Sequence, residues 1–258
     1  MTTAAQQLRL DDGRSVACIS PAEARMLWNE MVDDGFYRQA AATLRPGDVA
    51  LDIGANIGLS AMMFADTAPG VRVIAAEPAP LTYDCLHRNM SAHVPGGLAL
   101  EAAIGAEPGV LPFTVYPRAT ANSSLYADKA ADDEATRVFL RNSGLPDDAI
   151  TMITEGLHDG EQIDVEVTTV SALLAKHDPT AEVGVLKIDV ERAEFDVLMG
   201  IDDADWPRIR SVVAEVHDRN NGLARFCDVL TARGFTTRAR QDPSLAGTEL
   251  HEVYATRD

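Results

Sequence analysis

The fold is decided by residues 49–60, which read VALDIGANIGLS. The apolar run at residues 49–53 is typical of a buried strand, Gly54 marks a tight turn, and a helical pattern follows. Residues 71–76 form a second apolar run, which ends at Glu77 and is again followed by a helical pattern. Strands without a polar face that alternate with helices favour an α/β fold, in which helices cover both faces of a parallel sheet.

The same alternation resumes in the second half of the chain and predicts how the domain is organised. Further strands are expected at residues 165–167, 183–190 and 212–217, and a terminal antiparallel hairpin at residues 235–240 and 250–256. The alternation lapses at residues 106–162, which we interpret as an inserted lid or substrate segment. We therefore expect an N-terminal helical cap at residues 1–44 and a main domain at residues 45–258 that contains the insertion.

Charge and cysteine content argue against several classes of partner and site. Asp and Glu number 40 against 22 Lys and Arg, and the formal net charge of -18 would repel nucleic acid and anionic membranes. Cys18, Cys85 and Cys227 are not at metal-ligand spacings and are expected to be reduced thiols, so no metal site is predicted from them. No stretch approaches the roughly 18 consecutive apolar residues of a membrane-spanning helix, and the first residues lack a signal-peptide pattern. We therefore expect a soluble, cytoplasmic protein.

The turn after the first strand predicts a nucleoside-binding site. Gly54 and Gly58 permit the close approach of a ligand and of the helix, and Asn56 lies between them. Glu77 follows Gly54 by 23 residues and can accept hydrogen bonds from both ribose hydroxyls. Asp52 is placed to receive an ammonium group, directly or through water. This combination fits S-adenosylmethionine, whereas the missing third glycine argues against NAD; the alternative is a structural turn capped by Asp52, with Glu77 in solvent.

A second polar cluster ends two of the later strands and predicts the catalytic group. Lys187, Asp189 and Glu191 share one face of their strand because side chains alternate along it. Glu215 and His217 likewise share one face of the neighbouring strand. We expect His217 to be a general base, oriented by Glu215 or Asp189. The alternatives are a structural ion-pair network and a divalent ion bound by Asp189, Glu215 and His217, although no spacing demands a metal.

The insertion contributes three candidates for substrate binding. Arg118 and Ser123 lie in the segments YPR and NSS, which would place a guanidinium and a hydroxyl near the cavity mouth to bind a carboxylate or another polar group. The same segments are equally typical of turns. His158 is a second candidate base, with a solvent-facing loop histidine as the alternative.

Taken together, these residues resemble those of FkbM-type methyltransferases, which depend on S-adenosylmethionine. The resemblance covers nearly the whole chain and rests on residues 49–60, 76–78, 116–118, 186–198, 205–207 and 215–218. It implies a Rossmann-like class I methyltransferase fold with a mostly parallel seven-stranded sheet. It also implies cofactor contacts by Asp52, Gly54, Asn56, Gly58 and Glu77. Arg192-Ala193 departs from the small or basic pair expected after LKIDVE, and residues 119–124 depart from the usual run after YPR.

The resemblance also implies the reaction. Relatives in polyketide and nonribosomal-peptide pathways commonly methylate hydroxyl or carboxyl oxygens, so we expect O-methylation of a small molecule or of a carrier-tethered intermediate. A hydroxyl acceptor would need a base such as His217, whereas a carboxylate is already ionised at neutral pH. Three alternatives stay open: an N-methyltransferase, an NAD-dependent oxidoreductase and a non-catalytic cofactor-binding docking module. The sequence does not decide whether the protein forms a homodimer.

Overall fold

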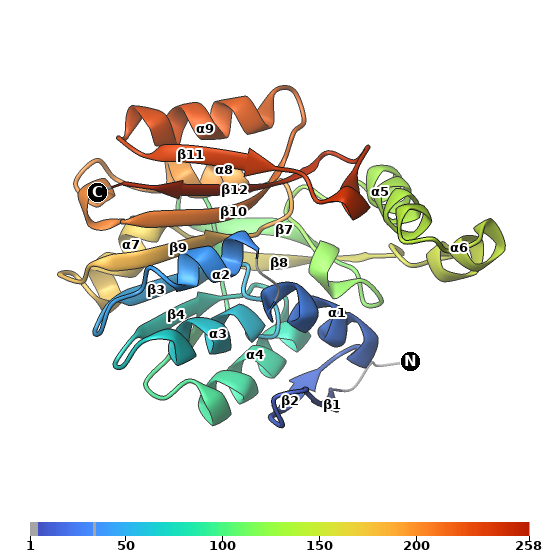
Figure 1. Cartoon of the computed structure of the whole chain (residues 1–258), viewed down its shortest axis with the longest axis horizontal. Helices are drawn as coiled ribbons and strands as arrows, with labels where there is room; N and C mark the ends of the chain where they lie inside the picture. The colour runs from blue at the N-terminus through green and yellow to red at the C-terminus, as the bar shows by residue number, and fades with distance from the viewer. Residues whose placement is uncertain (1–4, 33–34, 258) are drawn as a thin grey trace.

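A computed structural model describes residues 5–32 and 35–257 of the chain. Within these residues a seven-stranded sheet runs in the order β11-β12-β10-β9-β3-β4-β5 (Figure 1). Neighbouring strands from β10 to β5 are parallel, whereas β12 is antiparallel to both β10 and β11. The strands are β3 (Val49–Ile53), β4 (Arg72–Ala76), β5 (Leu98–Leu100), β9 (Val183–Ile188), β10 (Ser211–His217), β11 (Thr236–Arg240) and β12 (Leu250–Thr256). The α/β fold and the C-terminal antiparallel hairpin that the sequence predicts are confirmed.

Apolar side chains alternate between the two faces of the sheet, which explains why its strands read as continuous apolar runs. Ala50 belongs to the core on one face, and Leu51 belongs to the core on the other. The first face is covered by α1 (Pro21–Val32), α2 (Phe36–Ala41), α3 (Leu59–Thr67) and α4 (Pro80–His93), and the second by α7 (Val170–His177), α8 (Glu194–Met199) and α9 (Gly222–Ala232). None of the helices within residues 5–32 and 35–257 is long and apolar enough to cross a membrane.

The amino-terminal segment differs in part from the expected helical cap. A hairpin of β1 (Gln6–Arg9) and β2 (Ser15–Cys18) precedes α1 and α2. These strands are too short for a clear alternating pattern, so the sequence analysis missed them. The hairpin is tied to α4 because Asn89 accepts a hydrogen bond from the Ala17 N–H at 2.7 Å and donates to the Ala17 carbonyl at 2.8 Å.

The insertion is a substructure with its own sheet. In the described chain, β6 (Ala103–Ile104), β7 (Gly109–Val115) and β8 (Glu161–Thr168) form a three-stranded sheet in the order β6-β8-β7. The strand expected at residues 165–167 therefore belongs to this small sheet and not to the main one. Its burial alternates along the strand, as expected when one face lies outside a core. Between β7 and β8, α5 (Lys129–Asn142) and α6 (Asp147–Thr154) project from the body of the molecule (Figure 1).

The turn after β3 is packed against the end of β9. Gly54 has a φ of 73°, and a Cβ atom there would lie 1.7 Å from the carbonyl oxygen of Asp189, so no other residue fits. Gly58, the N-cap residue of α3, has a φ of 88°, and a Cβ atom there would lie 2.7 Å from the Leu86 side chain of α4. Gly54 therefore brings two strand ends together at the centre of the sheet. This is the position at which ligands bind in open α/β sheets.

Candidate active site

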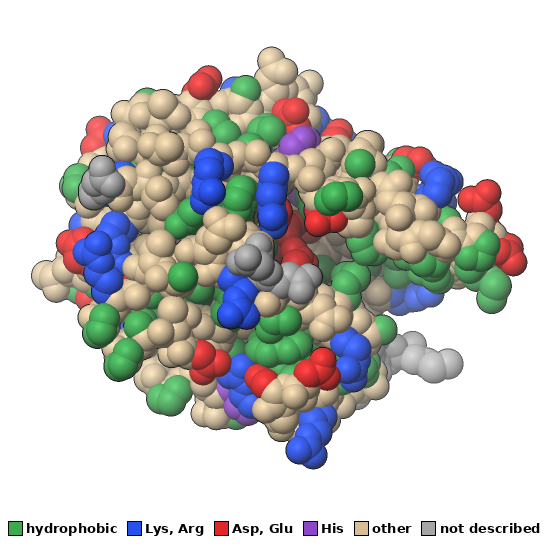
Figure 2. Space-filling view, viewed as in Figure 1, with side chains coloured by type: hydrophobic (Ala, Val, Ile, Leu, Met, Phe, Trp, Pro, Cys, Tyr) green, Lys and Arg blue, Asp and Glu red, His purple; other side chains and the backbone are tan. Residues whose placement is uncertain are grey.

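A cavity of about 1070 Å³ lies at the carboxyl ends of β3, β4, β9 and β10, and α1, the insertion and the connection between β11 and β12 also line it. Figure 2 shows acidic side chains inside a hollow near the centre of the face viewed. The described lining contains three arginines, Arg118, Arg192 and Arg240. Against these stand the carboxyl side chains of Glu23, Glu30, Glu77, Asp132, Glu134, Asp189, Glu191, Glu215, Asp242, Glu249 and Glu252. The cavity therefore favours a cationic ligand over an anionic one.

Glu77 lies at the tip of β4 and is held in one orientation by backbone groups. Its Oε2 accepts a hydrogen bond from the Asn56 N–H at 3.1 Å, and its Oε1 accepts one from the Ala79 N–H at 2.9 Å. Burial raises the pKa of Glu77 to about 7, although both hydrogen bonds lower it. Each oxygen keeps a free lone pair, and Glu77, Asn56 and Gly54 all line the cavity. The carboxyl group can therefore accept hydrogen bonds from a diol.

Lys187 connects the ends of β3 and β9. Its Nζ lies 3.1 Å from Asp52 Oδ1 and 3.2 Å from Asp189 Oδ2, and it donates to the Gly54 carbonyl at 2.7 Å. Burial alone would lower the pKa of Lys187, but the two aspartates raise it above its ordinary value. Asp52 is completely buried and also accepts a hydrogen bond from the Ser60 hydroxyl at 2.6 Å. Within the described part of the chain, Asp52 therefore does not line the cavity itself. It is connected through Lys187 to Asp189, which does.

Like Asp52, the predicted cofactor residue Gly58 does not line the cavity as described. It serves the contact between α3 and α4. Of the five predicted cofactor residues, Gly54, Asn56 and Glu77 thus line the cavity, while Asp52 and Gly58 lie behind this lining.

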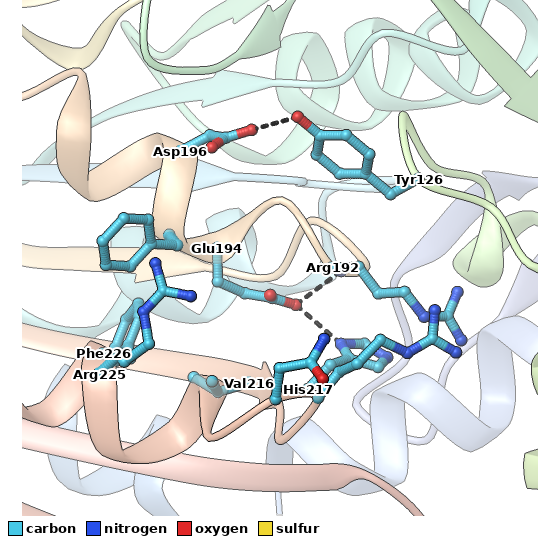
Figure 3. Close-up of a pocket in the computed structure, with 12 residues that line it drawn as sticks. Tyr126, Arg192, Glu194, Asp196, Val216, His217, Arg225 and Phe226 are labelled. Atoms are coloured by element: carbon cyan, nitrogen blue, oxygen red, sulfur yellow. Dashed lines mark hydrogen bonds and ion pairs between the residues drawn. The ribbon is translucent and has the colours of Figure 1, made fainter.

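His217 lies at the end of β10 between two carboxylates, of which Figure 3 shows Glu194. Its Nδ1 is 2.8 Å from Glu194 Oε1, and its Nε2 is 3.3 Å from Glu191 Oε2. Burial would lower the pKa of His217, but the hydrogen bonds to these two carboxylates raise it to about 10. The imidazole therefore carries protons on both nitrogens at neutral pH and has no lone pair with which to act as a base. The expected orienting partners, Glu215 and Asp189, are replaced in this position by Glu194 and Glu191.

Glu215 faces a different set of groups, from the first two helices. Glu215 is hydrogen-bonded to Glu30 of α1, and its Oε1 is 3.4 Å from the Tyr37 hydroxyl of α2. Burial, Asp189 and Glu30 raise the pKa of Glu215 well above its ordinary value. Desolvation of its carboxyl group and the charge of Asp189 raise the pKa of Glu30 to about 7, although the residue as a whole is exposed at the surface. Because a hydrogen bond between two carboxyl groups requires a proton, the pair holds one proton between its members. Sequence reasoning missed Glu30 and Tyr37, which lie in helices without a motif.

The three predicted substrate residues are only partly brought together. Arg118 lines the cavity and donates to the Glu155 carbonyl at 2.7 Å. Ser123 also lines the cavity, and its hydroxyl accepts a hydrogen bond from the Tyr116 N–H at 3.0 Å. His158 is buried and lies outside the described lining, since its Nδ1 is 2.8 Å from Asp133 Oδ1 and its ring packs edge-on against Tyr116. His158 is therefore neither solvent-facing nor placed to contact a substrate.

A second, smaller cavity of about 400 Å³ adjoins the first (Figure 3). Arg192 and His217 line both cavities and so form the wall between them. Arg192 donates from Nη2 to Asp132 Oδ1 at 2.6 Å, and its backbone N–H donates to Glu194 Oε1 at 2.8 Å. Arg192 is one of the two residues that depart from the pair expected after LKIDVE, and no role could be assigned to it from the sequence.

Asp189, Glu215 and His217 are not arranged as ligands of a divalent ion. Within the described residues there is no group of three or more His, Cys, Asp or Glu side chains arranged to hold a metal ion. Asp189 pairs with Lys187, Glu215 with Glu30, and His217 with Glu191 and Glu194. The three proposed ligands thus contact separate partners.

The chain is similar to several known methyltransferases and to part of a larger synthetase. Residues 52–237 match the family model described as Methyltransferase FkbM domain. The chain is 43% identical over 259 residues to 31-O-demethyl-FK506 methyltransferase FkbM of Streptomyces tacrolimicus, with 100% of this chain and 99% of the relative covered. It is 33% identical to AMB antimetabolite synthetase AmbE of Pseudomonas aeruginosa, of which it covers 12%, with 97% of this chain aligned. A crystal structure of methyltransferase FkbM from Methylobacillus flagellatus has a similar fold, with a TM-score of 0.51 at 13% identity, covering 91% of this chain and 58% of the other.

Proposed function

This chain belongs to the FkbM methyltransferase family, and from that premise we propose that it transfers a methyl group from S-adenosylmethionine to a hydroxyl oxygen of a small-molecule acceptor, free or tethered to a carrier. The observation that carries this proposal is the carboxylate-lined cavity at the carboxyl ends of the central strands, where ligands bind in open α/β sheets. Glu77 is fixed by hydrogen bonds at one wall of this cavity.

The residues present fit the methyl donor. S-Adenosylmethionine supplies an electrophilic methyl group on a cationic sulfur, and a cavity lined by carboxylates attracts that charge. Glu77 would hold the ribose hydroxyls, and Gly54 and Asn56 would lie beside the nucleoside. Asp189, anchored by Lys187, is the carboxylate available for the ammonium group, with Asp52 supporting it from behind.

The charge of the cavity also supports a hydroxyl acceptor. A carboxylate acceptor would be repelled by the acidic lining. An amine would be held there in its protonated form, which lacks the lone pair needed for attack. A hydroxyl group is neutral and avoids both penalties. The Streptomyces relative is named as a methyltransferase for 31-O-demethyl-FK506, which supports the same choice.

The chain's residues contribute mainly by positioning, with one proton acceptor. Holding the acceptor oxygen in line with the methyl group can supply roughly 7–11 kcal/mol of the barrier. His217 is a cation at neutral pH, and its ion pairs fix Glu191 and Glu194 beside the reacting groups. The proton of the hydroxyl would pass to the pair of Glu30 and Glu215, because a carboxyl group with a pKa near neutrality is suited to general-base work.

The proposal is tested with the purified chain, S-adenosylmethionine and 31-O-demethyl-FK506 as the probe acceptor. We expect S-adenosylhomocysteine and a product heavier by one methylene group, formed in equal amounts. Titration with NADH should give no binding, which separates this function from an oxidoreductase. Binding of S-adenosylmethionine without transfer to this probe or to its carrier-bound form would favour the docking module. Absence of S-adenosylmethionine binding would overturn the proposal.

A further inference from the structure

Arg192 lines the cavity and carries two side-chain donor nitrogens that have no hydrogen-bond partner among the described residues. Its side chain is 8% exposed, and its Nε and Nη1 have no hydrogen-bond partner in the described part of the chain. The other buried side-chain atoms in this condition belong to Asp52, Asp178 and Trp206, none of which lines the cavity as described. A buried donor without a partner is unfavourable, so two on one guanidinium beside a cavity point to a ligand that accepts from them.

The backbone places Arg192 at a cost in conformational energy. Glu191 and Arg192 have φ values of 52° and 76°, and two successive residues other than glycine rarely adopt this left-handed conformation. The turn is held by hydrogen bonds on both sides, since Ser124 donates to the Glu191 carbonyl and Glu194 accepts from the Arg192 N–H. Strain that the surroundings maintain in this way is typical of functional sites.

Asp132 of α5 fixes the direction in which the guanidinium points. Its Oδ1 accepts from Arg192 Nη2, and its Oδ2 accepts from the Tyr116 hydroxyl at 2.9 Å. Asp132 is itself buried, so the ion pair joins the insertion to the end of β9 away from solvent. The aspartate also neutralises the guanidinium, which leaves two oriented donor nitrogens rather than a site of net positive charge.

We propose that Arg192 binds the acceptor molecule through a second, neutral oxygen atom, distinct from the hydroxyl that is methylated. The inference rests on the proposed function and specifies its acceptor as a molecule that bears a hydroxyl, ether or carbonyl oxygen besides the reacting one. Donation to the reacting oxygen itself would stabilise its lone pairs and slow attack on the methyl group. The surrounding carboxylates disfavour a carboxylate as the bound group.

The test compares Arg192→Met and Arg192→Lys with wild type, by calorimetric binding of 31-O-demethyl-FK506 to the S-adenosylhomocysteine complex. Loss of hydrogen bonds from a charged donor should weaken acceptor binding about 10- to 100-fold in Arg192→Met, and by less in Arg192→Lys. Binding of S-adenosylhomocysteine should stay unchanged. Arg210→Met is the matched control, because Arg210 also pairs with a buried aspartate, Asp48, and lies outside the described lining. It should lower stability without weakening acceptor binding.

A second readout does not depend on this acceptor. Isotope-edited NMR of arginine Nε–H groups, assigned with Arg192→Lys, follows the Arg192 signal as cyclohexane-1,2-diol or cyclohexanecarboxylate is added to the S-adenosylhomocysteine complex. A shift with the diol supports the inference. A shift with the carboxylate alone, a shift with neither probe, or wild-type acceptor affinity in Arg192→Met would overturn it. Failure of S-adenosylhomocysteine to bind wild type would instead be a failure of the proposed function.

Discussion

His217 Nδ1 lies 2.8 Å from Glu194 Oε1, although 23 residues separate the two along the chain. Glu194 lies in the first turn of α8. Glu191 lies in the strained turn before that helix and contacts the other ring nitrogen, Nε2. The end of β10 and the start of α8 are therefore joined by a buried cation between two carboxylates. From this relationship we propose that His217 is a charged positioning group and not a base.

His217→Gln should lower the stability of the protein more than it changes any pH optimum. Removing the cation leaves Glu191 and Glu194 buried and facing one another, and loss of one partner of a buried pair costs about 3–5 kcal/mol. Because the folded-state pKa of His217 is raised to about 10, its contribution is fully present below the unfolded pKa and is lost as pH rises through about 10. Urea unfolding near neutral pH measures the difference. If the activity of wild type changed with a midpoint near pH 6.5 and this change were absent in His217→Gln, His217 would be the general base after all.

Glu77→Gln should weaken binding of S-adenosylhomocysteine about 10- to 100-fold, since an amide replaces a carboxylate that would accept from two hydroxyls. The amide NH₂ would also face a backbone N–H, of Asn56 or of Ala79. Calorimetry of wild type and variant gives the ratio. Glu101→Gln is the control, because Glu101 is exposed and lies outside the described cavity lining. Equal affinity of Glu77→Gln and wild type would remove Glu77 from the cofactor site.

The sequence predicted most of the fold, and it brought Gly54, Asn56 and Glu77 to one end of the sheet, because both depend on local patterns. VALDIGANIGLS combines a strand, a turn that needs glycine and a helix within 12 residues, and Glu77 follows at the next strand end. The partners of His217 and Glu215 could not be predicted, since Glu194 and Glu30 come from helices that reach the cavity only through tertiary packing. His158 was misplaced for the same reason, because a loop histidine gives no sign that Asp133 will enclose it.

Asp52 and Lys187 should behave as one energetic unit. Asp52→Asn leaves a buried ammonium short of one counter-ion, and Lys187→Met leaves a buried aspartate, so each is expected to cost about 3–5 kcal/mol of stability. The double variant should be less destabilised than the sum of the two, by more than about 1 kcal/mol. Chemical denaturation of all four proteins completes the cycle. If the losses of unfolding free energy in the two single variants add up to that of the double variant, the 3.1 Å contact between Asp52 and Lys187 contributes no interaction energy.

The pair of Glu30 and Glu215 should make both stability and turnover depend on pH near neutrality, in opposite directions. Both folded-state pKa values are raised, that of Glu30 to about 7, so the stabilising contribution is fully present below about pH 4.5 and the part due to Glu30 is lost as pH rises through about 7. The melting temperature of wild type should therefore fall between roughly pH 5 and pH 8, and Glu30→Gln should flatten this fall.

Turnover should rise over the same interval if the pair accepts the proton of the hydroxyl, because the ionised form is the reactive one. Glu215→Gln should lower kcat by about 10²- to 10⁴-fold, with little change in the KM for S-adenosylmethionine, and Glu215→Asp should recover part of it. Glu134→Gln is the matched control, since Glu134 lines the same cavity from α5 and should leave the midpoint of the pH profile in place. A melting temperature that depends equally on pH in wild type and Glu30→Gln, or a kcat unchanged in Glu215→Gln, would show that the two carboxyl groups neither share the proton nor receive it.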